Sequence, residues 1–293
     1  MTRPDMAVDG PAAPAGAVSV ALCQLAPTIG DVEANRARIL AAVHAAKDEG
    51  ADVVVLPELA TSGYVFEDEA EARRLAEPAV GPTTNAVHDL AASLDLTVVV
   101  GLPELWGGRL FNSAVVVDRT GVRATYRKVH LWGRESQVFS PGDDPAPVVD
   151  MGWGRLALLI CYDLEFPEWV RRAALSGAEL VCAPTNWPDE GRPEGERPVE
   201  MVTVLAAAAA NRIFIAACDR VGAERGTQWV GGSVLAGPDG YPLATADLTQ
   251  REQHLLARCD LLQARDKTVG AYNDRFADRR IDLYPDEPET DTA

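Results

Sequence analysis

A cysteine stands where a buried strand is expected to end and a helix to begin. Residues 156–160 form a short apolar run, Cys161 follows it, and Pro167 is placed to open a helix, since proline is tolerated in the first helical turn. Backbone N–H groups at such a junction stabilise negative charge, which suits a thiolate nucleophile. A free cysteine is also a small apolar side chain that is often simply buried. The position alone leaves both roles open.

A carboxylate follows a second apolar run. Glu58 comes directly after Pro57 at the end of the Val-rich residues 51–56. At such a position a carboxylate either caps the strand at the surface or lies partly buried. Burial raises the pKa of a carboxyl group because it disfavours the charged form, and a general base that works near neutral pH needs that shift. Both interpretations of Glu58 stay open at this point.

A lysine and a histidine lie at the end of a third expected strand. Alternation along this strand puts Lys128 and His130 on the same face. A lysine at a strand end is usually solvated, whereas a lysine buried beside carboxylates stays charged and can hold an oxyanion. His130 offers an alternative in which it pairs with Cys161 as the base. That arrangement needs a third group to orient the imidazole, and the sequence shows none.

The elements that must position these side chains alternate in type along the chain. Two halves show the same order, with helix–strand units followed by strand–strand units, and a Pro238-Asp239-Gly240 turn marks a hairpin in the second half. This order predicts an α/β (α+β) fold of two mixed sheets packed face to face, with helices outside. The expected strands are 18–25, 51–56, 96–101, 111–117, 122–128, 156–160, 179–183, 213–219, 233–236, 241–245 and 253–259, and the expected helices are 31–47, 67–75, 83–94, 167–176 and 198–211.

Composition limits the partners and the number of domains. The chain has 293 residues and a net charge of −17, from 44 acidic and 27 basic residues, which disfavours nucleic acid and anionic membranes as partners. No apolar run approaches the roughly 20 residues of a membrane span. We expect one domain over residues 18–284, a flexible N-terminal extension at 1–17 that is not a signal peptide, and an acidic C-terminal tail at 285–293.

The cysteines and histidines predict neither disulfides nor a metal. The chain has five cysteines, an odd number with no C-x-x-C pair, which is typical of a reduced, cytoplasmic protein. Its four histidines are scattered, without metal-ligand spacing. No Gly-rich phosphate loop or dinucleotide fingerprint is present, so we expect no organic cofactor either.

Three segments in one order resemble the nitrilase, or carbon–nitrogen hydrolase, superfamily. Each segment is weak alone, but their order and spacing together are specific, and the resemblance covers about residues 18–284. Gly232-Ser233 ahead of the hairpin turn also fits the late part of the family pattern. The three segments are Pro57-Glu58 after a strand, Tyr126-Arg127-Lys128-Val129-His130-Leu131, and Ile160-Cys161-Tyr162-Asp163 with Phe166-Pro167-Glu168.

The resemblance assigns roles that the residues alone do not. It implies Cys161 as nucleophile, Glu58 as general base and Lys128 as oxyanion stabiliser, with the backbone N–H of Tyr162 completing the oxyanion hole. It also implies that Glu135, by itself an ordinary exposed loop residue, helps to fix the lysine and the substrate. The implied fold is a four-layer α-β-β-α sandwich. The implied assembly is a homodimer or larger, through residues 167–176 and 261–284.

The segment at the nucleophile favours an amidase branch of this family. True nitrilases tend to carry Cys-Trp-Glu there, whereas this chain has Cys161-Tyr162-Asp163, and residues 219–226 and 273–280 resemble aliphatic amidases. The implied reaction converts small aliphatic amides to a carboxylic acid and ammonia through a thioester. A nitrilase or an N-carbamoyl amino acid amidohydrolase would use the same groups. A non-catalytic binding protein is a distant alternative, because the full set of site residues is retained.

Three further side chains are candidates for the substrate pocket. Tyr64 lies six residues after Glu58, and Asn186 and Trp187 follow the strand after the nucleophile. An aromatic side chain in such a loop either forms a wall of the acyl pocket or packs against its neighbours. The charged loop at 189–197 is placed to rim the entrance. None of these residues specifies the acyl group.

Overall fold

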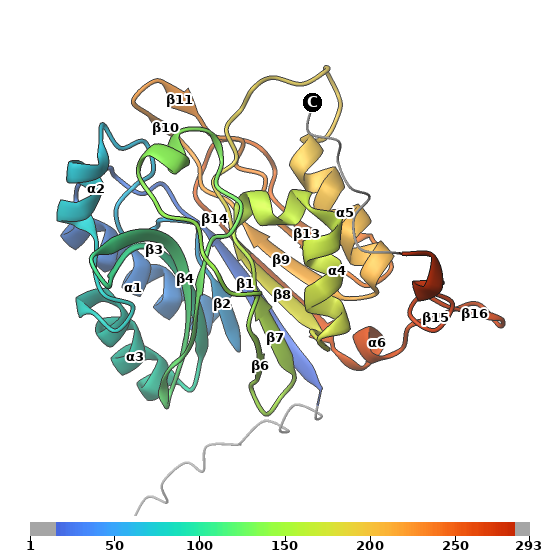
Figure 1. Ribbon diagram of the computed structural model, residues 1–293. Helices are drawn as coiled ribbons and strands as arrows, with labels where there is room; N and C mark the ends of the chain where they lie inside the picture. The colour runs from blue at the N-terminus through green and yellow to red at the C-terminus, as the bar shows by residue number, and fades with distance from the viewer. Residues whose placement is uncertain (1–15, 285–293) are drawn as a thin grey trace, which may run out of the picture.

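The computed structural model describes residues 16–284 as two β-sheets packed face to face (Figure 1). The acidic tail expected at 285–293 lies outside the described residues, as does the expected extension up to residue 15. Ala17 is already the first residue of strand β1, so the fold begins inside the segment that was expected to be flexible.

The first sheet carries two of the predicted site residues at the ends of its strands. Its central strands β1, β2 and β3 are parallel, and the strands on either side are antiparallel to them. In spatial order the sheet consists of β14 (Gln253–Asp260), β1 (Ala17–Gln24), β2 (Val53–Val55), β3 (Thr97–Trp106), β4 (Arg109–Asp118) and β5 (Gly121–Arg127).

The second sheet repeats this pattern. Strands β7, β8 and β9 form a parallel centre, and the flanking strands are antiparallel. The likeness of the two halves that the sequence predicted is therefore confirmed at the level of sheet topology. In spatial order the sheet consists of β13 (Pro242–Thr245), β12 (Val234–Ala236), β9 (Phe214–Cys218), β8 (Leu180–Pro184), β7 (Arg155–Leu158) and β6 (Val148–Asp150).

Helices cover the outer face of each sheet and complete the four layers (Figure 1). Helices α1 (Val32–Asp48), α2 (Glu69–Leu75) and α3 (Pro82–Leu94) lie on the side of the first sheet, and α4 (Pro167–Leu175) and α5 (Val199–Asn211) on the side of the second. Asp31 caps α1 as expected, since its carboxylate accepts the N–H of Ala34. Within residues 16–284 no helix is both long and apolar enough to cross a bilayer.

The alternation of side chains along the strands builds two separate cores. Val53 and Val55 point into the core between the sheets, together with residues of β7, β8 and β9. Val54, between them in sequence, packs with Ile39 and Val43 of α1 in the core beneath the helices. Burial on both faces explains why the central strands are continuous apolar runs rather than alternating ones.

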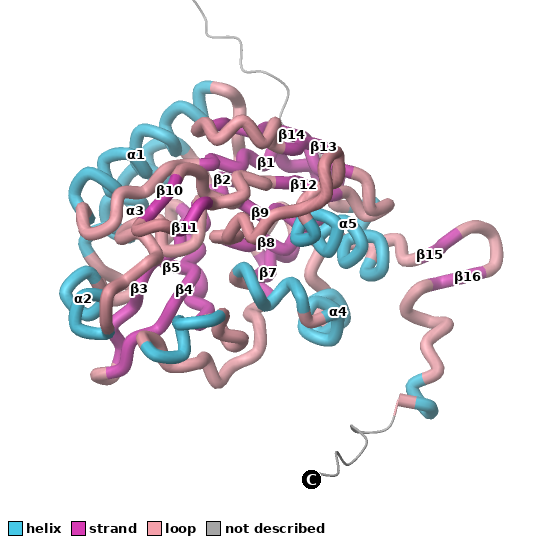
Figure 2. The backbone as a smooth tube through the Cα atoms, turned by 90° about the horizontal axis from the view of Figure 1, so that it is seen from above, coloured by secondary structure: helices cyan, strands magenta, loops and turns pink. Residues whose placement is uncertain are grey.

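The short elements are the ones that sequence patterns did not predict. They include β6, the short helix α6 (Leu262–Arg265), and two hairpins whose strands have two residues each. One hairpin pairs β10 (Ala223–Glu224) with β11 (Thr227–Gln228), and the other pairs β15 (Thr268–Val269) with β16 (Asn273–Asp274). Strands of two residues have too few positions to show a period, so only their pairing defines them. The β15–β16 segment extends away from the body of the molecule (Figure 2).

Gly101 of β3 lets this strand approach the segment that carries Glu58. A Cβ atom there would lie 2.7 Å from the Pro57 carbonyl oxygen and 2.8 Å from Glu58 Cα. We therefore expect Gly101→Ala to destabilise the protein by about 1–3 kcal/mol, as overpacking against backbone does. Urea unfolding measures this change. Gly237→Ala is the control, since the atom nearest to a Cβ there is at the carboxylate end of the Asp239 side chain. Equal stability of the two variants would contradict the expectation.

Candidate active site

Cys161 lies where the second sheet ends. It is the first residue of a 3₁₀ turn, Cys161–Glu165, which separates β7 from α4. Its backbone is left-handed, with φ of 46°, and non-glycine residues in this region are strained and cluster at functional sites. The side chain is 6% exposed, and the thiol lies 3.7 Å from the Asn186 carbonyl oxygen. The predicted junction between strand and helix is therefore present, with a sharp turn that the sequence did not reveal.

A buried aspartate braces this turn. The Asp163 carboxylate accepts hydrogen bonds from the backbone N–H of Ile160 at 3.0 Å and of His130 at 3.1 Å, and from the Tyr126 hydroxyl at 2.9 Å. Asp163 is fully buried, so each of these bonds is shielded from water. In the sequence, Asp163 stands out only as part of a motif, because its contacts with Tyr126 and His130 join positions more than 30 residues apart.

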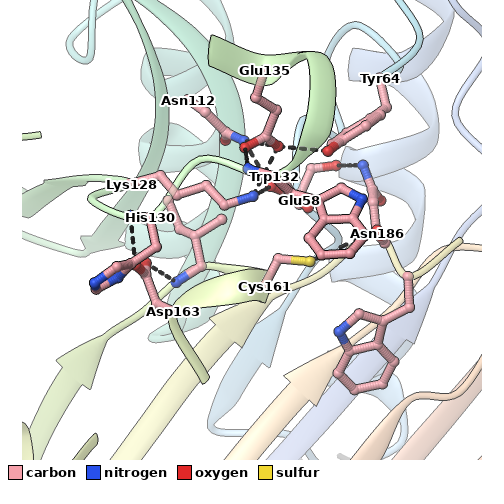
Figure 3. A network of polar contacts seen from close by, with 12 residues as sticks. Glu58, Tyr64, Asn112, Lys128, His130, Trp132, Glu135, Cys161, Asp163 and Asn186 are labelled. Carbon is pink, nitrogen blue, oxygen red and sulfur yellow. Dashed lines mark hydrogen bonds and ion pairs between the residues drawn. The ribbon is translucent and has the colours of Figure 1, made fainter. Parts of the chain in front are cut away.

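His130 belongs to this brace and not to the nucleophile. Its Nδ1 lies 2.7 Å from Asp163, and its ring stacks on Phe166 with centroids 3.8 Å apart. In Figure 3 its ring points away from Cys161. Strand β5 ends at Arg127, so the alternation that put Lys128 and His130 on one face does not extend to His130. The third group that the Cys–His alternative needed is present in Asp163, but it turns the imidazole away from the thiol.

Lys128 is fully buried between two carboxylates (Figure 3). Its Nζ donates to Glu58 Oε1 at 2.7 Å and to Glu135 Oε1 at 2.8 Å. Burial by itself lowers the pKa of a lysine, but the charges of Glu135 and Glu58 outweigh it and hold the pKa of Lys128 above its ordinary value. The lysine is thus charged at any physiological pH, and one of its three N–H groups is left for another acceptor.

Glu135 is buried, so the interpretation of this residue as an exposed loop position is wrong. It lies in the 3₁₀ turn Gly133–Gln137 and is 4% exposed. Its Oε1 accepts the Tyr64 hydroxyl at 2.6 Å in addition to Lys128, and its Oε2 accepts the N–H of Trp132 at 2.9 Å. Both oxygens are engaged, so this carboxylate serves the structure of the site.

Glu58 follows β2 and has one engaged and one free oxygen. Oε1 accepts Lys128 and also the Asn112 amide at 2.6 Å, whereas Oε2 has no hydrogen-bond partner among the described residues. Burial raises the pKa of Glu58 to about 8, against the opposing charge of Lys128. Burial also raises the pKa of the Cys161 thiol, and the charge of Glu58 adds to that effect. With such a pKa the ionised carboxylate becomes available as the pH approaches 8, and its free oxygen can then accept a proton.

A cavity of about 200 Å³ opens beside this cluster. Tyr64 lines it, as do Glu135 and exposed Arg134, and aromatic side chains form part of its wall. Trp229 forms part of that wall and packs edge-on against Tyr64, with centroids 5.2 Å apart, although no sequence pattern singled it out. The aromatic lining residues are Tyr64, Phe66, Trp132, Phe139 and Trp229.

Asn186 and Trp187 do not line this cavity. Asn186 donates from Nδ2 to the Glu58 carbonyl oxygen at 2.9 Å, so it holds the backbone of the Glu58 segment. Trp187 is 3% exposed and packs into the hydrophobic core, and its backbone N–H donates a hydrogen bond to the Asp219 carboxylate. Trp187 therefore packs against its neighbours and does not form a wall of this cavity.

A buried ion pair holds the loop of Tyr64 and Val65, which lines the same cavity. Arg220 donates to Glu224 at 2.9 Å, and both side chains are almost fully buried. The other oxygen of Glu224 accepts the N–H groups of Tyr64 and Val65 at 2.8 and 2.6 Å. Breaking a buried pair leaves an uncompensated charge, so this contact fixes the Tyr64 loop firmly.

Within residues 16–284, no three His, Cys, Asp or Glu side chains are grouped to hold a metal ion.

The chain matches a known family over most of its length. A family model described as carbon–nitrogen hydrolase matches residues 19–267. A nitrilase of Pyrococcus abyssi is 36% identical over 91% of this chain and 99% of its own length. An (R)-stereoselective amidase of a Pseudomonas species is 35% identical over 93% of this chain and 95% of its own length.

Solved structures of an amidase share this fold. The crystal structure of an amidase from Nesterenkonia sp. superposes with a TM-score of 0.76 at 30% identity, over 94% of this chain and 98% of that one. A variant of that amidase, with a TM-score of 0.75 at 29% identity over the same shares, carries the acetamide moiety of fluoroacetamide covalently added at its active-site cysteine.

The raised pKa of Glu58 predicts a loss of stability with rising pH. The folded protein keeps this proton up to about pH 8, whereas an unfolded glutamate releases it near its ordinary pKa of 4.5, so stability falls as pH rises through that window. Between about pH 6 and pH 8 the loss is about 2–3 kcal/mol, at about 1.4 kcal/mol per pH unit. Glu58→Gln removes this titration.

Urea unfolding of both proteins at about pH 6 and about pH 9 measures the effect. We expect the stability of Glu58→Gln relative to the wild type to rise by that amount at the higher pH. A difference between the two proteins that does not change with pH would contradict a raised pKa at Glu58.

Proposed function

The chain belongs to the carbon–nitrogen hydrolase family, and we propose that it is a cysteine-dependent amidase of small aliphatic amides. The observation that carries the proposal is the free Oε2 of Glu58, which is buried in the cluster that also holds Lys128 beside the Cys161 turn. These are the three groups that amide hydrolysis through a thioester needs: a nucleophile, a base and a fixed positive charge for the oxyanion.

The proposed reaction begins with proton transfer. Glu58 Oε2 takes the thiol proton of Cys161, and the thiolate attacks the amide carbonyl carbon. The Glu58 proton then passes to the leaving nitrogen, the C–N bond breaks, and ammonia departs from a thioester. Glu58 next accepts a proton from water, whose oxygen attacks the thioester and releases the carboxylic acid. The proton returns to the Cys161 sulfur, so the enzyme ends as it began.

Two donors stabilise the oxyanion in this proposal. The first is the N–H of Lys128 that neither Glu58 nor Glu135 occupies. The second is the backbone N–H of Tyr162 in the first turn of the Cys161–Glu165 helix, where N–H groups have no acceptor within the helix. Lys128 is fully buried, and where water is excluded an oriented donor stabilises developing charge strongly.

The lining of the cavity supports a neutral acyl group. Aromatic and aliphatic side chains make up much of its wall, and the Tyr64 hydroxyl and the Glu135 carboxylate are already bonded to each other. Arg134 and Glu190, the charged residues at the rim, are exposed. An N-carbamoyl amino acid would need a buried cation for its carboxylate, and this wall presents none among its described residues.

A nitrilase is the second candidate, because the Pyrococcus abyssi relative at 36% identity carries that name. The same nucleophile and base would attack a nitrile carbon. The Nesterenkonia structures, which share the fold at TM-scores of 0.75 and 0.76, support the amidase instead.

We also propose a cytoplasmic homodimer. An apolar groove of about 540 Å³ lies between α4 and α5, and Val202 and Ala206 in its wall are exposed to solvent. The segment 261–284 exposes Tyr272, Ile281 and Leu283. A second copy that covers these surfaces would bury them. The five cysteines are all free and buried, which suits a reducing compartment.

Ammonia release from matched amides, nitriles and N-carbamoyl amino acids tests the activity. We expect kcat/KM to be highest for small neutral amides. Cys161→Ala should abolish turnover, and Lys128→Ala should lower kcat by about 10²–10³, the usual effect of losing one oxyanion donor. Cys182→Ala is the control, since Cys182 is a buried free cysteine of β8. Faster nitrile turnover would select the nitrilase, and turnover by Cys161→Ala would exclude this mechanism.

Light scattering coupled to gel filtration tests the assembly. We expect a dimer for the wild type and a shift toward monomer for Val202→Glu, because the substitution places a charge in the α4–α5 groove. Val80→Glu is the matched control, since Val80 is similarly exposed but outside this groove. A wild-type monomer, or a Val202→Glu variant that stays dimeric, would overturn the proposed interface.

A further inference from the structure

Asn112 of β4 bonds to the same two carboxylate oxygens as Lys128. Its Nδ2 donates to Glu58 Oε1 at 2.6 Å and to Glu135 Oε1 at 3.2 Å. The side chain is 1% exposed. The two Oε1 atoms therefore lie between two donor nitrogens, one charged and one neutral, and Figure 3 shows the amide facing the carboxylates.

The backbone of Asn112 supports the same arrangement. Its carbonyl oxygen accepts the N–H of Lys128 at 2.8 Å, which continues the β4–β5 pairing by one residue beyond the end of β5. Asn112 thus holds the main chain of the lysine and, with its side chain, the two anions that bind the ammonium group. Few single residues could do both, because the side chain must point from the strand directly into the cluster.

The amide is held in this orientation at a cost. Only its NH₂ end can face two carboxylates, since an amide oxygen there would be repelled. Its own Oδ1 is buried and has no partner among the described residues. An unpaired buried acceptor destabilises the fold, so the hydrogen bonds of the side chain as a whole do not explain why an asparagine stands here. The bonds that its NH₂ group donates to Glu58 and Glu135 do explain it.

We propose that Asn112 is a positioning residue for the reaction, which holds the Oε1 edges of Glu58 and Glu135 beside Lys128. This inference rests on the proposed amidase function. With both Oε1 atoms occupied, Oε2 is the one oxygen of Glu58 left to accept the Cys161 proton. Because the amide shares these carboxylates, Lys128 keeps its third N–H for the oxyanion.

The charges around Glu58 show why a neutral donor is needed there. Lys128 and Glu135 act on its pKa, and its charge in turn shifts the pKa values of Cys161, Tyr64 and Arg220. One lysine faces two carboxyl groups, so the cluster gains a surplus of negative charge when Glu58 ionises. The Asn112 hydrogen bond favours the charged form of Glu58 and lowers its pKa without adding a charge. Removing the donor therefore raises the pKa of Glu58.

The pH dependence of kcat/KM for amide hydrolysis tests this role. We expect the acidic limb of the wild-type kcat/KM profile to have its midpoint near pH 8. In Asn112→Ala this midpoint should move up by about one pH unit, since a hydrogen bond to a charged group changes its pKa by about that amount. At pH values below the limb this shift lowers kcat/KM by about 10-fold. The isosteric Asn112→Asp should shift in the same direction, because its ionised form repels Glu58.

Ser113→Ala is the matched control. Ser113 is the next residue of β4, is equally buried, and bonds to Glu104 and not to the cluster. Loss of the Ser113 hydroxyl should leave the acidic limb of the kcat/KM profile at the wild-type pH. Circular dichroism and urea unfolding show whether each variant is folded. A limb that stays at the wild-type pH in both folded Asn112 variants would overturn the proposal, and failure of both to fold would assign Asn112 to the fold and overturn it as well.

Alkylation of Cys161 by iodoacetamide, measured across the same pH range, separates this inference from the proposed function. The reaction needs no amide substrate, and its rate follows activation of the thiol. A shifted alkylation profile in Asn112→Ala, together with no turnover of any amide by the wild type, would support the role of Asn112 in thiol activation and overturn the amidase. An unshifted profile with normal wild-type turnover would overturn only the role of Asn112.

Discussion

The burial of one ammonium group between two carboxylates is the interaction on which the rest of the site depends. Lys128 is out of contact with water, and only Glu58 and Glu135 compensate its charge. A buried charge without such partners would be strongly destabilising. Burial, together with the negative surplus that a second anion beside one cation would create, raises the pKa values of Glu58 and Cys161. In the proposed reaction the ionised form of Glu58 accepts the thiol proton.

This cluster requires both sheets. Glu58, Asn112 and Lys128 come from the first sheet, and Cys161 comes from the second. The parallel centre of each sheet directs strand ends to the same edge, where α/β proteins commonly place their sites. Close packing at Gly101 then brings β3 against the Glu58 segment, and the Asp163 brace holds Cys161 in a left-handed backbone conformation that an unsupported residue would leave. Stability and reactivity share the same contacts here.

Sequence patterns predicted the long elements well, because the buried strands are apolar runs and the long helices carry apolar residues at helical spacing. They failed at the short elements and at the direction of single side chains. Alternation along β5 put His130 on the face of Lys128, but the strand ends three residues before His130. Glu135 had no local sign of burial, because its partners are Tyr64, which is 71 positions away, and Lys128, which lies seven positions away beyond the end of another element. Only the family resemblance pointed to it.

The sequence by itself determined the layered fold and the order of glutamate, lysine and cysteine at three strand ends. These follow from local periodicity and from residue types that persist in any context. Only the tertiary structure decided which groups meet. It directed His130 to Asp163, packed Trp187 in the core, put Trp229 in the cavity wall, and placed Asn112 between two carboxylates. The hydrogen bonds of His130 and Asn112 join positions 23 to 54 residues apart, and a hydrogen bond over such a separation has no local signature in the chain.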